Sequence, residues 1–375
     1  MNRRRRKPKE DIAEQFKKAA SQPRKISTEL LIPTGSTMLN CCCSDNPFGG
    51  FQLGKIVTIP GPSQSGKSIV AWSMLATVAH DKRFDGYDLI YDDIEEAMEF
   101  DASYLFGEKT AKRVKAPKYE KDEAIYSHSI QDLESAILKR CDKGDCKPFI
   151  WVADSLDGLT SEEELEREYA NAILRAKDGD HAKQIQQSYG TEKARIIGRM
   201  LRLVKGYLKK TKSTLVMVQQ ERDKLGAPVF AKQYTTSGGR APFYYSSHQV
   251  RLLNSGTIKD KNIPTGNKLQ AYVVKNKLNG KKRDCAFCVY EDYGIDDIAS
   301  CVDFLAKEHW KNARDNKGAI KANTFIADEL EFEGTKAKII DHIEENQLEK
   351  TMQKTVGIAW NKIEESLRLG RTRRF

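Results

Sequence analysis

The residues best suited to chemistry in this chain of 375 residues form one run, Gly61-Pro62-Ser63-Gln64-Ser65-Gly66-Lys67-Ser68. The run satisfies G-x-x-x-x-G-K-[ST], in which glycines let the backbone wrap around phosphates and amide N–H groups donate to them. By this pattern Lys67 would bridge the β- and γ-phosphates, and Ser68 would ligate Mg²⁺. The pattern predicts a site for a nucleoside triphosphate with Mg²⁺, and a glycine-rich turn without a ligand is the alternative.

Acidic residues at two further places suit hydrolysis of that triphosphate. Asp154 follows the apolar run 149–153, where a carboxylate at the carboxyl end of a strand can hold the Mg²⁺ shell. Glu95 and Glu96 follow the strand expected at 87–93, at the carboxyl edge where either could orient and deprotonate an attacking water. A capping aspartate and the acidic first turn of an ordinary helix are the alternatives for these positions.

The elements that must position these side chains alternate along the chain. Strands without polar alternation, typical of buried parallel sheets, are expected at 55–60, 87–93, 149–154 and 214–219. Helices are expected at 68–80, 129–141 and 191–210, the second beginning behind Ser129 with Asp132 three residues on. This order predicts an α/β fold with a mostly parallel sheet covered by helices on both faces.

The pattern changes after residue 245. Strands at 249–254, 269–275 and 286–292 are joined by turns and are expected to form a hairpin-rich edge of the same sheet. From about 297 the chain is mixed, with helical stretches near 336–348 and 355–369, which predicts a small C-terminal α+β domain. We therefore divide the chain into a basic arm with a short helix (11–20) and linker (1–32), a core (33–296) and a C-terminal domain (297–375).

Composition excludes several classes of protein. Hydrophobic residues make up 39% of the chain, enough for a sizeable core, and no apolar run approaches the about 18 residues that a membrane span requires. Eight cysteines in a chain of this size favour a reducing compartment over a disulfide framework. The first nine and last ten residues together carry the whole net charge of +10, so they are expected to attract polyanions non-specifically, with specific contacts or an address signal as alternatives.

The cysteines predict no zinc site. Cys285 and Cys288 lie in a strand-like run, where residues three apart point to opposite faces of the sheet. Cys41, Cys42 and Cys43 are consecutive, which is poor geometry for ligating one metal. Small buried residues are their expected role.

The order of these motifs resembles that of the RecA-type recombinases over roughly residues 26–300, most of all a divergent, phage-borne member. The resemblance runs through Pro33-Thr34-Gly35-Ser36, 49–57, the phosphate loop, 90–97 and 152–155. It implies a RecA-like P-loop NTPase core that binds ATP and Mg²⁺. It places the catalytic glutamate at Glu95, with Glu96 as second choice, and implies that Gln220 contacts the γ-phosphate and opens the second DNA-binding loop.

That second loop is recognised in Tyr234-Thr235-Thr236-Ser237-Gly238-Gly239-Arg240-Ala241, which is similar to the family's Thr/Gly-Gly segment. Glycines allow close approach to phosphates, and Ser and Thr hydroxyls donate to them. The implied DNA-binding residues are Arg222, Thr235, Thr236, Ser237, Gly238, Gly239 and Arg240. An ordinary flexible loop is the alternative for the bare sequence. The first DNA-binding loop is expected between Leu159 and Thr191, where this chain departs from the family with a longer, highly charged stretch.

Two further carry-overs concern the nucleotide. Lys275 and Lys277 resemble the family's paired lysines, which reach across a subunit interface to the neighbour's γ-phosphate, and two cations at this spacing share one side of a strand. Lysines on a solvated edge strand are the alternative. The family's adenine-stacking aromatic is out of register here, and Tyr104 is its nearest candidate.

The resemblance implies an ATP-dependent recombinase that forms a helical filament of identical subunits on single-stranded DNA and exchanges strands with double-stranded DNA. ATP would lie between subunits. Single-strand-binding and mediator proteins are further candidate partners, and the expected location is the cytoplasm with the nucleoid, or the host cytoplasm if a phage encodes the protein. The alternatives are a hexameric helicase built on the same core and an ATP-binding mediator filament without useful hydrolysis.

Overall fold

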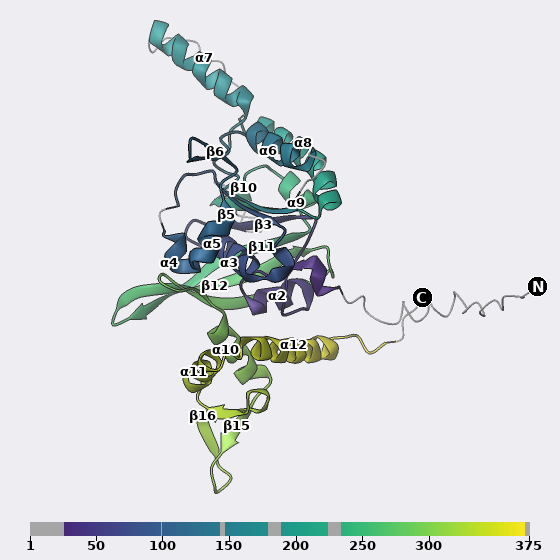
Figure 1. Ribbon diagram of the computed structural model, residues 1–375, viewed down its shortest axis with the longest axis vertical. Helices are drawn as coiled ribbons and strands as arrows, with labels where there is room; N and C mark the ends of the chain where they lie inside the picture. Colours follow the sequence, from purple (N-terminus) through teal and green to yellow (C-terminus); the bar gives the residue numbers. More distant parts are fainter. Residues whose placement is uncertain (1–25, 99, 143–146, 179–188, 224–233, 372–375) are drawn as a thin grey trace, which may run out of the picture.

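The computed structural model describes residues 26–98, 100–142, 147–178, 189–223 and 234–371, and the expected helix at 11–20 lies outside them. Its centre is a ten-stranded sheet (Figure 1). Along the sheet the order is β14 (Gly294–Asp296), β13 (Asp284–Tyr290), β12 (Ile263–Asn276), β11 (His248–Asp260), β3 (Ile56–Gly61), β9 (Thr214–Asp223), β8 (Phe149–Asp154), β4 (Asp88–Asp93) and β5 (Val114–Lys115), with β10 (Tyr234–Thr236) paired to β9.

The strands that carry the predicted site are parallel. β11, β3, β9, β8, β4 and β5 pair in parallel in that order, whereas β12, β13 and β14 pair antiparallel at one edge. The predicted α/β fold, the mostly parallel sheet and the hairpin-rich edge are therefore confirmed. Because parallel strands end at one edge, Gly61, Asp93, Asp154 and Gln220 lie along the same side of the sheet.

Both faces of the sheet are buried, which explains the uninterrupted apolar runs. On one face Val57, Val152 and Val216 pack with residues of α3 (Lys67–His80) in one core cluster. On the other face Trp151 and Met217 pack with residues of α6 (Ile130–Asp142) and α8 (Tyr189–Thr211) in a second cluster. Alternate residues of a strand thus enter different cores, so each strand needs apolar side chains throughout.

Local signals define the start of α6. The backbone N–H of Ser129 donates to Asp132 Oδ2 at 2.9 Å, and the N–H of Asp132 donates to Ser129 Oγ at 3.0 Å. This reciprocal pair is a capping box, in which two otherwise unpaired donors at a helix N-terminus are satisfied. The expected N-cap is confirmed.

Further helices and strands precede the C-terminal part. They are η1 (Thr28–Leu30), β1 (Leu31–Ile32), α2 (Thr37–Ser44), β2 (Phe51–Gln52), η2 (Lys82–Phe84), α4 (Ala102–Phe106), α5 (Glu108–Arg113), β6 (Lys118–Glu120), β7 (Glu123–Ile125), α7 (Glu162–Asp178) and α9 (Ala241–Tyr245).

The C-terminal part forms a small unit that packs on α2. It consists of α10 (Asp297–Glu308), β15 (Lys311–Arg314), β16 (Ile320–Ala327), η4 (Asp328–Leu330), β17 (Phe332–Gly334), α11 (Lys336–Glu345) and α12 (Glu349–Ser366), with the three strands forming one antiparallel sheet. Asp297 accepts hydrogen bonds from the N–H (2.6 Å) and the hydroxyl (2.7 Å) of Thr37. Trp360 Nε1 donates to Asp45 Oδ1 at 3.1 Å. The limits drawn at 33 and 297 for independent domains stay a prediction.

The cysteines of α2 are buried in this contact. Cys41, Cys42 and Cys43 are each 0% exposed and belong to the larger core cluster, which confirms their expected role as small buried residues. Cys285 and Cys288 lie on β13, the first buried and the second half-buried, as expected of alternate faces. Among the described residues no group of three or more His, Cys, Asp or Glu side chains is placed to hold a metal ion, and the absence of zinc stays a prediction.

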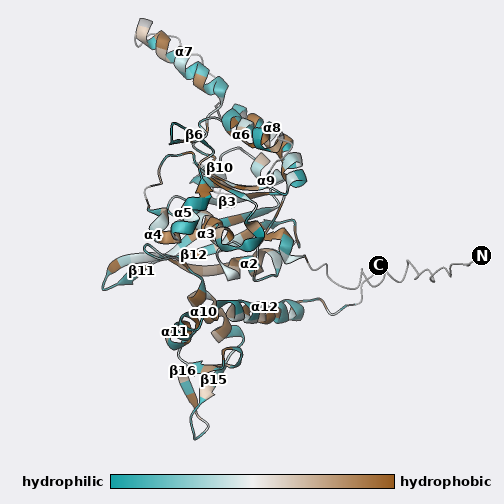
Figure 2. Ribbon diagram, in the orientation of Figure 1, coloured by the Kyte–Doolittle hydropathy of each residue, from teal (hydrophilic) through white to brown (hydrophobic). Residues whose placement is uncertain are grey.

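The segment expected as the first DNA-binding loop is largely a helix. α7 spans Glu162–Asp178 and projects from the sheet (Figure 1), while 179–188 lie outside the described residues. Ser161 Oγ accepts the N–H of Glu164 at 3.1 Å, and the acidic first turn suits the positive end of the helix. Leu165, Tyr169 and Ile173 recur every four residues but remain exposed, and Figure 2 shows hydrophilic and hydrophobic segments along α7.

Across the described residues, none of the helices has both the length and the apolar character needed to cross a membrane.

Candidate nucleotide and DNA site

The phosphate loop joins the end of β3 to the start of α3. Gly66 has φ +74°, a conformation that favours glycine, and a Cβ there would lie 2.4 Å from Leu269 Cδ1, which would have to move. No described side chain caps the first turn of α3. Its amide N–H groups and the positive end of the helix are therefore available to phosphate oxygens.

Lys67 is held over this loop. Its Nζ donates to the carbonyl of Pro62 at 2.6 Å, so the ammonium lies against the loop backbone, where phosphates would sit. Burial lowers the pKa of Lys67, while the nearby carboxylates of Asp154 and Glu95 oppose that shift. The loop thus places one cation close to two of the predicted acidic residues.

Ser68 and Asp154 form the candidate magnesium site. Asp154 ends β8 and is buried, and the hydroxyl of Tyr91 donates to its Oδ2 at 2.7 Å. Burial raises the pKa of Asp154, while the side chains of Ser68 and Tyr91 oppose the shift. A hydroxyl beside a carboxylate at the foot of a phosphate loop is a donor set that Mg²⁺ accepts, so these residues fit the predicted cofactor.

Glu95 and Glu96 point to different neighbours. The exposed Glu95 accepts hydrogen bonds at Oε1 from the hydroxyl of Ser155 and from Gln220 Nε2, the latter at 3.4 Å. Glu96 Oε1 instead lies 3.9 Å from His128 Nδ1. Gln220 is beside the phosphate loop because it pairs with Gly61 across the parallel strands β9 and β3. Of the two glutamates, Glu95 is therefore the one that lies with Gln220 and Asp154.

The predicted DNA-binding residues gather at the end of β9. β10 runs antiparallel to it, which sets Thr235 opposite Arg222 and Thr236 opposite Glu221. Gly238 follows with φ +82°, and a Cβ there would lie 2.9 Å from Pro242 Cγ. Gly239 and Arg240 are exposed just before α9, whereas 224–233 lie outside the described residues.

The paired lysines reach one carbonyl. Lys275 Nζ donates to the carbonyls of Phe243 and Tyr244, the latter at 3.1 Å, and Lys277 Nζ donates to that of Tyr244 at 3.0 Å. Their side chains therefore share one side, at the end of α9. Lys275 lies where β12 pairs with β11 but no longer with β13, and Lys277 follows the end of the strand, so lysines on a solvated edge strand stay the alternative.

Tyr104 is not brought to the phosphate loop by any contact within the described ranges. It lies on α4 and is 71% exposed. Phe100 and Phe106, on either side of it in sequence, pack instead against Trp72 of α3. The adenine contact stays a prediction.

Sequence reasoning missed three residues of this site. Tyr91 and Ser155 donate to Asp154 and Glu95, and Asp157 accepts from Gln220 and Ser237. Tyr91 gave no signal because aromatic residues are common in buried strands. Asp157 gave none either, because aspartate is common in turns.

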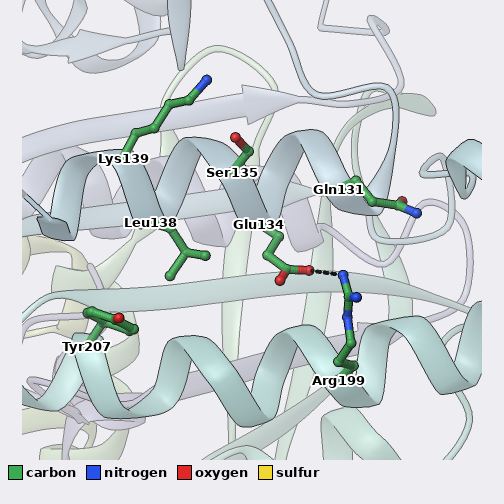
Figure 3. Close-up of a pocket in the computed structure, with 7 residues that line it drawn as sticks. All are labelled: Gln131, Glu134, Ser135, Leu138, Lys139, Arg199 and Tyr207. Carbon is green, nitrogen blue, oxygen red and sulfur yellow. Dashed lines mark hydrogen bonds and ion pairs between the residues drawn. The ribbon is translucent and has the colours of Figure 1, made fainter.

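Two surface hollows lie away from these residues. A cavity of about 460 Å³ separates α6 from α8, and Figure 3 shows Arg199 reaching across it to Glu134 at 3.1 Å. A second, of about 720 Å³, is lined by Tyr126, His128, Arg140 and other residues of α6 and the segment before it. Neither contains a predicted site residue, and in the first Glu134 and Arg199 are paired with each other.

Comparison with known proteins bears on the same strands. The family model described as the RecA N-terminal domain matches residues 150–296, which include Asp154, Gln220, the predicted second DNA loop and both lysines. Protein RecA of Kineococcus radiotolerans is 30% identical over 280 residues, which cover 74% of this chain and 70% of that protein.

Other relatives agree at lower identity. Protein RecA of Paenarthrobacter aurescens is 28% identical over 342 residues, 89% of this chain and 86% of that protein. Protein RecA of Ruminococcus albus is 27% identical over 272 residues, and the match spans 72% of this chain but only 60% of that protein. With its parallel sheet, its phosphate loop and these matches, the chain belongs to the RecA family.

Proposed function

We propose that this protein is an ATP-dependent DNA recombinase that polymerises on single-stranded DNA and catalyses homologous pairing and strand exchange. The observation that carries the proposal is the contact of Gln220 Nε2 with Glu95 Oε1 at 3.4 Å. It joins the candidate hydrolytic glutamate to the residue that begins the predicted DNA-binding segment. Nucleotide binding and DNA binding would thus depend on the same small group of side chains.

ATP would be held by residues already described. The amides of the phosphate loop and Lys67 would bind its phosphates, while Ser68 and Asp154 would hold the magnesium ion, which neutralises charge on the transferred phosphoryl group. Glu95 lies at the edge of the sheet and is exposed, so it can orient an attacking water and accept its proton. Ser155 and Gln220 would fix the direction of that carboxylate.

DNA would be bound by the segment that follows β9. The hydroxyls of Thr235, Thr236 and Ser237 and the exposed backbone of Gly239 suit phosphate contacts without sequence preference, and Arg222 and Arg240 add charge. Neither arginine lies within a helix that would keep a DNA strand away from it. Pairing between bases would then supply the sequence recognition.

Lys275 and Lys277 support a role at a subunit interface. Both cations lie on one side of the sheet edge and are engaged with backbone carbonyls of α9, from which they would transfer to a neighbour's γ-phosphate on assembly. Such an exchange would make ATP turnover depend on contact between protomers. It would also connect turnover to α9, which follows the predicted DNA loop directly.

The test combines ATPase assays with electron microscopy. Turnover is measured with and without a poly-dT oligonucleotide, and the same mixtures are imaged with a slowly hydrolysed ATP analogue. We expect DNA-stimulated turnover and helical filaments. Closed rings would support a helicase instead, and filaments without DNA-stimulated turnover would support a mediator; either result would overturn the proposal.

A further inference from the structure

A single buried carboxylate, that of Asp157, lies between the nucleotide site and the predicted DNA loop. Its side chain is 3% exposed, and it sits in the turn three residues after Asp154. Neither the phosphate-loop pattern nor the predicted DNA-binding segment includes it. Burying a charged group costs free energy unless several hydrogen-bond donors surround it, so the donors around Asp157 have to be identified.

Asp157 divides its two oxygens between two chain segments. Oδ2 accepts the backbone N–H of Gln220 at 2.7 Å, and Oδ1 accepts the hydroxyl of Ser237 at 2.6 Å. The two partners are 63 and 80 residues further along the chain. One belongs to the strand that faces the phosphate loop, and the other to the predicted DNA loop.

Two cations surround the same turn. Arg222 Nε lies 3.9 Å from Asp157 Oδ1, and Lys193 Nζ donates to the backbone carbonyl of Asp157 at 3.0 Å. A third contact binds the two segments directly, since Gln219 Nε2 donates to the carbonyl of Ser237 at 2.8 Å. The carboxylate is thus the centre of a network that ties β9 to the start of the loop.

The bonds are short and charge-assisted, which makes them stronger than bonds between neutral groups. Gln220 uses its backbone to bind Asp157 and its side chain to contact Glu95. Any movement of Gln220 when the nucleotide changes must therefore either carry Asp157 and Ser237 with it or leave a buried charge with one partner fewer. A network of this kind favours a joint movement over an independent one.

Resting on the function proposed above, we propose that Asp157 is a positioning residue that couples ATP binding to DNA binding by holding Gln220 and Ser237 in fixed relation. Coupling of this kind is reciprocal for equilibrium binding: ATP strengthens DNA affinity by the factor by which DNA strengthens ATP affinity. Loss of the carboxylate should reduce that shared factor and leave each separate affinity largely intact.

The experiment measures the affinity of full-length protein for a fluorescent poly-dT oligonucleotide by anisotropy, with and without a slowly hydrolysed ATP analogue. We expect Asp157→Ala to lower the ratio of the two affinities by about tenfold, within the range of ordinary allosteric couplings. Its DNA affinity without nucleotide should stay close to that of the wild type. Asp157→Asn should keep more of the ratio, because its amide can accept from Gln220 and donate to Ser237 Oγ.

A second variant keeps the test valid if Asp157→Ala does not fold. Ser237→Ala removes the hydroxyl that binds Asp157 and leaves Gln220 paired with Asp157, so it should lower the ratio without loss of fold. Because the same hydroxyl is a candidate DNA contact, its DNA affinity without nucleotide is measured separately, and only the ratio of the two affinities tests the role of Asp157. Asp132→Ala is the matched control: it removes an aspartate that accepts a backbone N–H, in the capping box of α6. The control should lower stability and leave the ratio unchanged.

The outcomes separate this inference from the function it rests on. If the DNA affinity of the wild type is the same with and without the analogue, both the proposed function and the role of Asp157 are overturned. If the analogue raises the DNA affinity of the wild type, Asp157→Ala and Ser237→Ala by the same factor, the role of Asp157 is overturned and the proposed recombinase function still stands. The role of Asp157 would also be overturned if the Asp132→Ala control lost the ratio to the same extent.

Discussion

Removing the hydroxyl of Tyr91 should weaken the magnesium-dependent part of nucleotide binding. The hydroxyl donates at 2.7 Å to Oδ2 of Asp154, and both side chains are buried. Tyr91→Phe keeps the ring, whose centroid lies 4.9 Å from that of Trp72, and removes the hydroxyl that makes this bond. Asp154 would then keep Ser68 as a neighbour but lose the donor to its Oδ2.

The size of the effect follows from that bond. A hydrogen bond to a charged group contributes about 1.5–3 kcal/mol, which corresponds to a change of roughly one to two powers of ten in an equilibrium constant. Loss of a partner that orients a metal ligand costs about 10- to 100-fold in metal affinity. We therefore expect the Mg²⁺ concentration at half-maximal effect to rise by about tenfold or more in Tyr91→Phe.

The assay titrates Mg²⁺ against binding of a fluorescent ATP analogue without DNA, so that turnover and polymerisation do not contribute. Tyr87→Phe is the control, because Tyr87 is adjacent to β4 and its ring packs on Phe84 rather than on the site. The control should leave the Mg²⁺ midpoint unmoved. An unmoved midpoint in Tyr91→Phe as well would show that this hydroxyl does not position a metal ligand.

Three other substitutions have defined outcomes. Glu95→Gln should lower DNA-stimulated turnover by about 10²- to 10⁴-fold while nucleotide binding persists, measured by single-turnover hydrolysis and analogue binding. Burial and the charge of Lys277 lower the pKa of Lys275 to about 8, so the Lys275 side chain is charged below that pH. The rate of ATP turnover should therefore fall as the pH rises through 8. In Lys275→Arg, which stays charged, the rate should not fall over this range. Burial raises the pKa of Asp92 to about 6, above its ordinary 3.8, so protonation of this carboxyl is easier in the folded than in the unfolded state. As the pH falls from 7 to 5, the unfolding free energy of the wild type should therefore rise by about 1 kcal/mol relative to that of Asp92→Asn. Urea denaturation at the two pH values measures this difference.

Each of these has a result that counts against it. If Glu95→Gln hydrolyses ATP at the normal rate, Glu95 is not the residue that accepts the proton of the attacking water. An identical pH profile for Lys275→Arg would show that the charge of Lys275 does not limit turnover. A constant difference in unfolding free energy across that pH range would show that Asp92 does not titrate there.

The parallel core was predictable because its signals are local. The strand at 149–154 has the bounds expected for it, since burial on both faces demands an unbroken apolar run that ends at a polar residue. The phosphate loop was equally accessible, because all its functional groups lie within eight consecutive residues. Physical constraints that act over a few residues leave a readable pattern.

Other features depend on contacts between distant segments. Tyr91 meets Asp154 across 63 residues, and Ser237 meets Asp157 across 80, so neither contact leaves a local pattern. α7 was missed for another reason: Leu165, Tyr169 and Ile173 recur at helical spacing, but charged neighbours dominate the stretch and no core contact marks it. Topology, rather than residue type, decides which of these side chains meet.

In the function proposed above, ATP binding between adjoining subunits and DNA binding are one event. The rate of ATP hydrolysis per protomer, followed as protein concentration is raised with and without single-stranded DNA, tests this coupling without any substitution. We expect a cooperative rise with concentration that is much steeper on DNA, because each active site would be completed by a neighbour's Lys275 and Lys277. A rate per protomer that is independent of both concentration and DNA would contradict the proposed coupling.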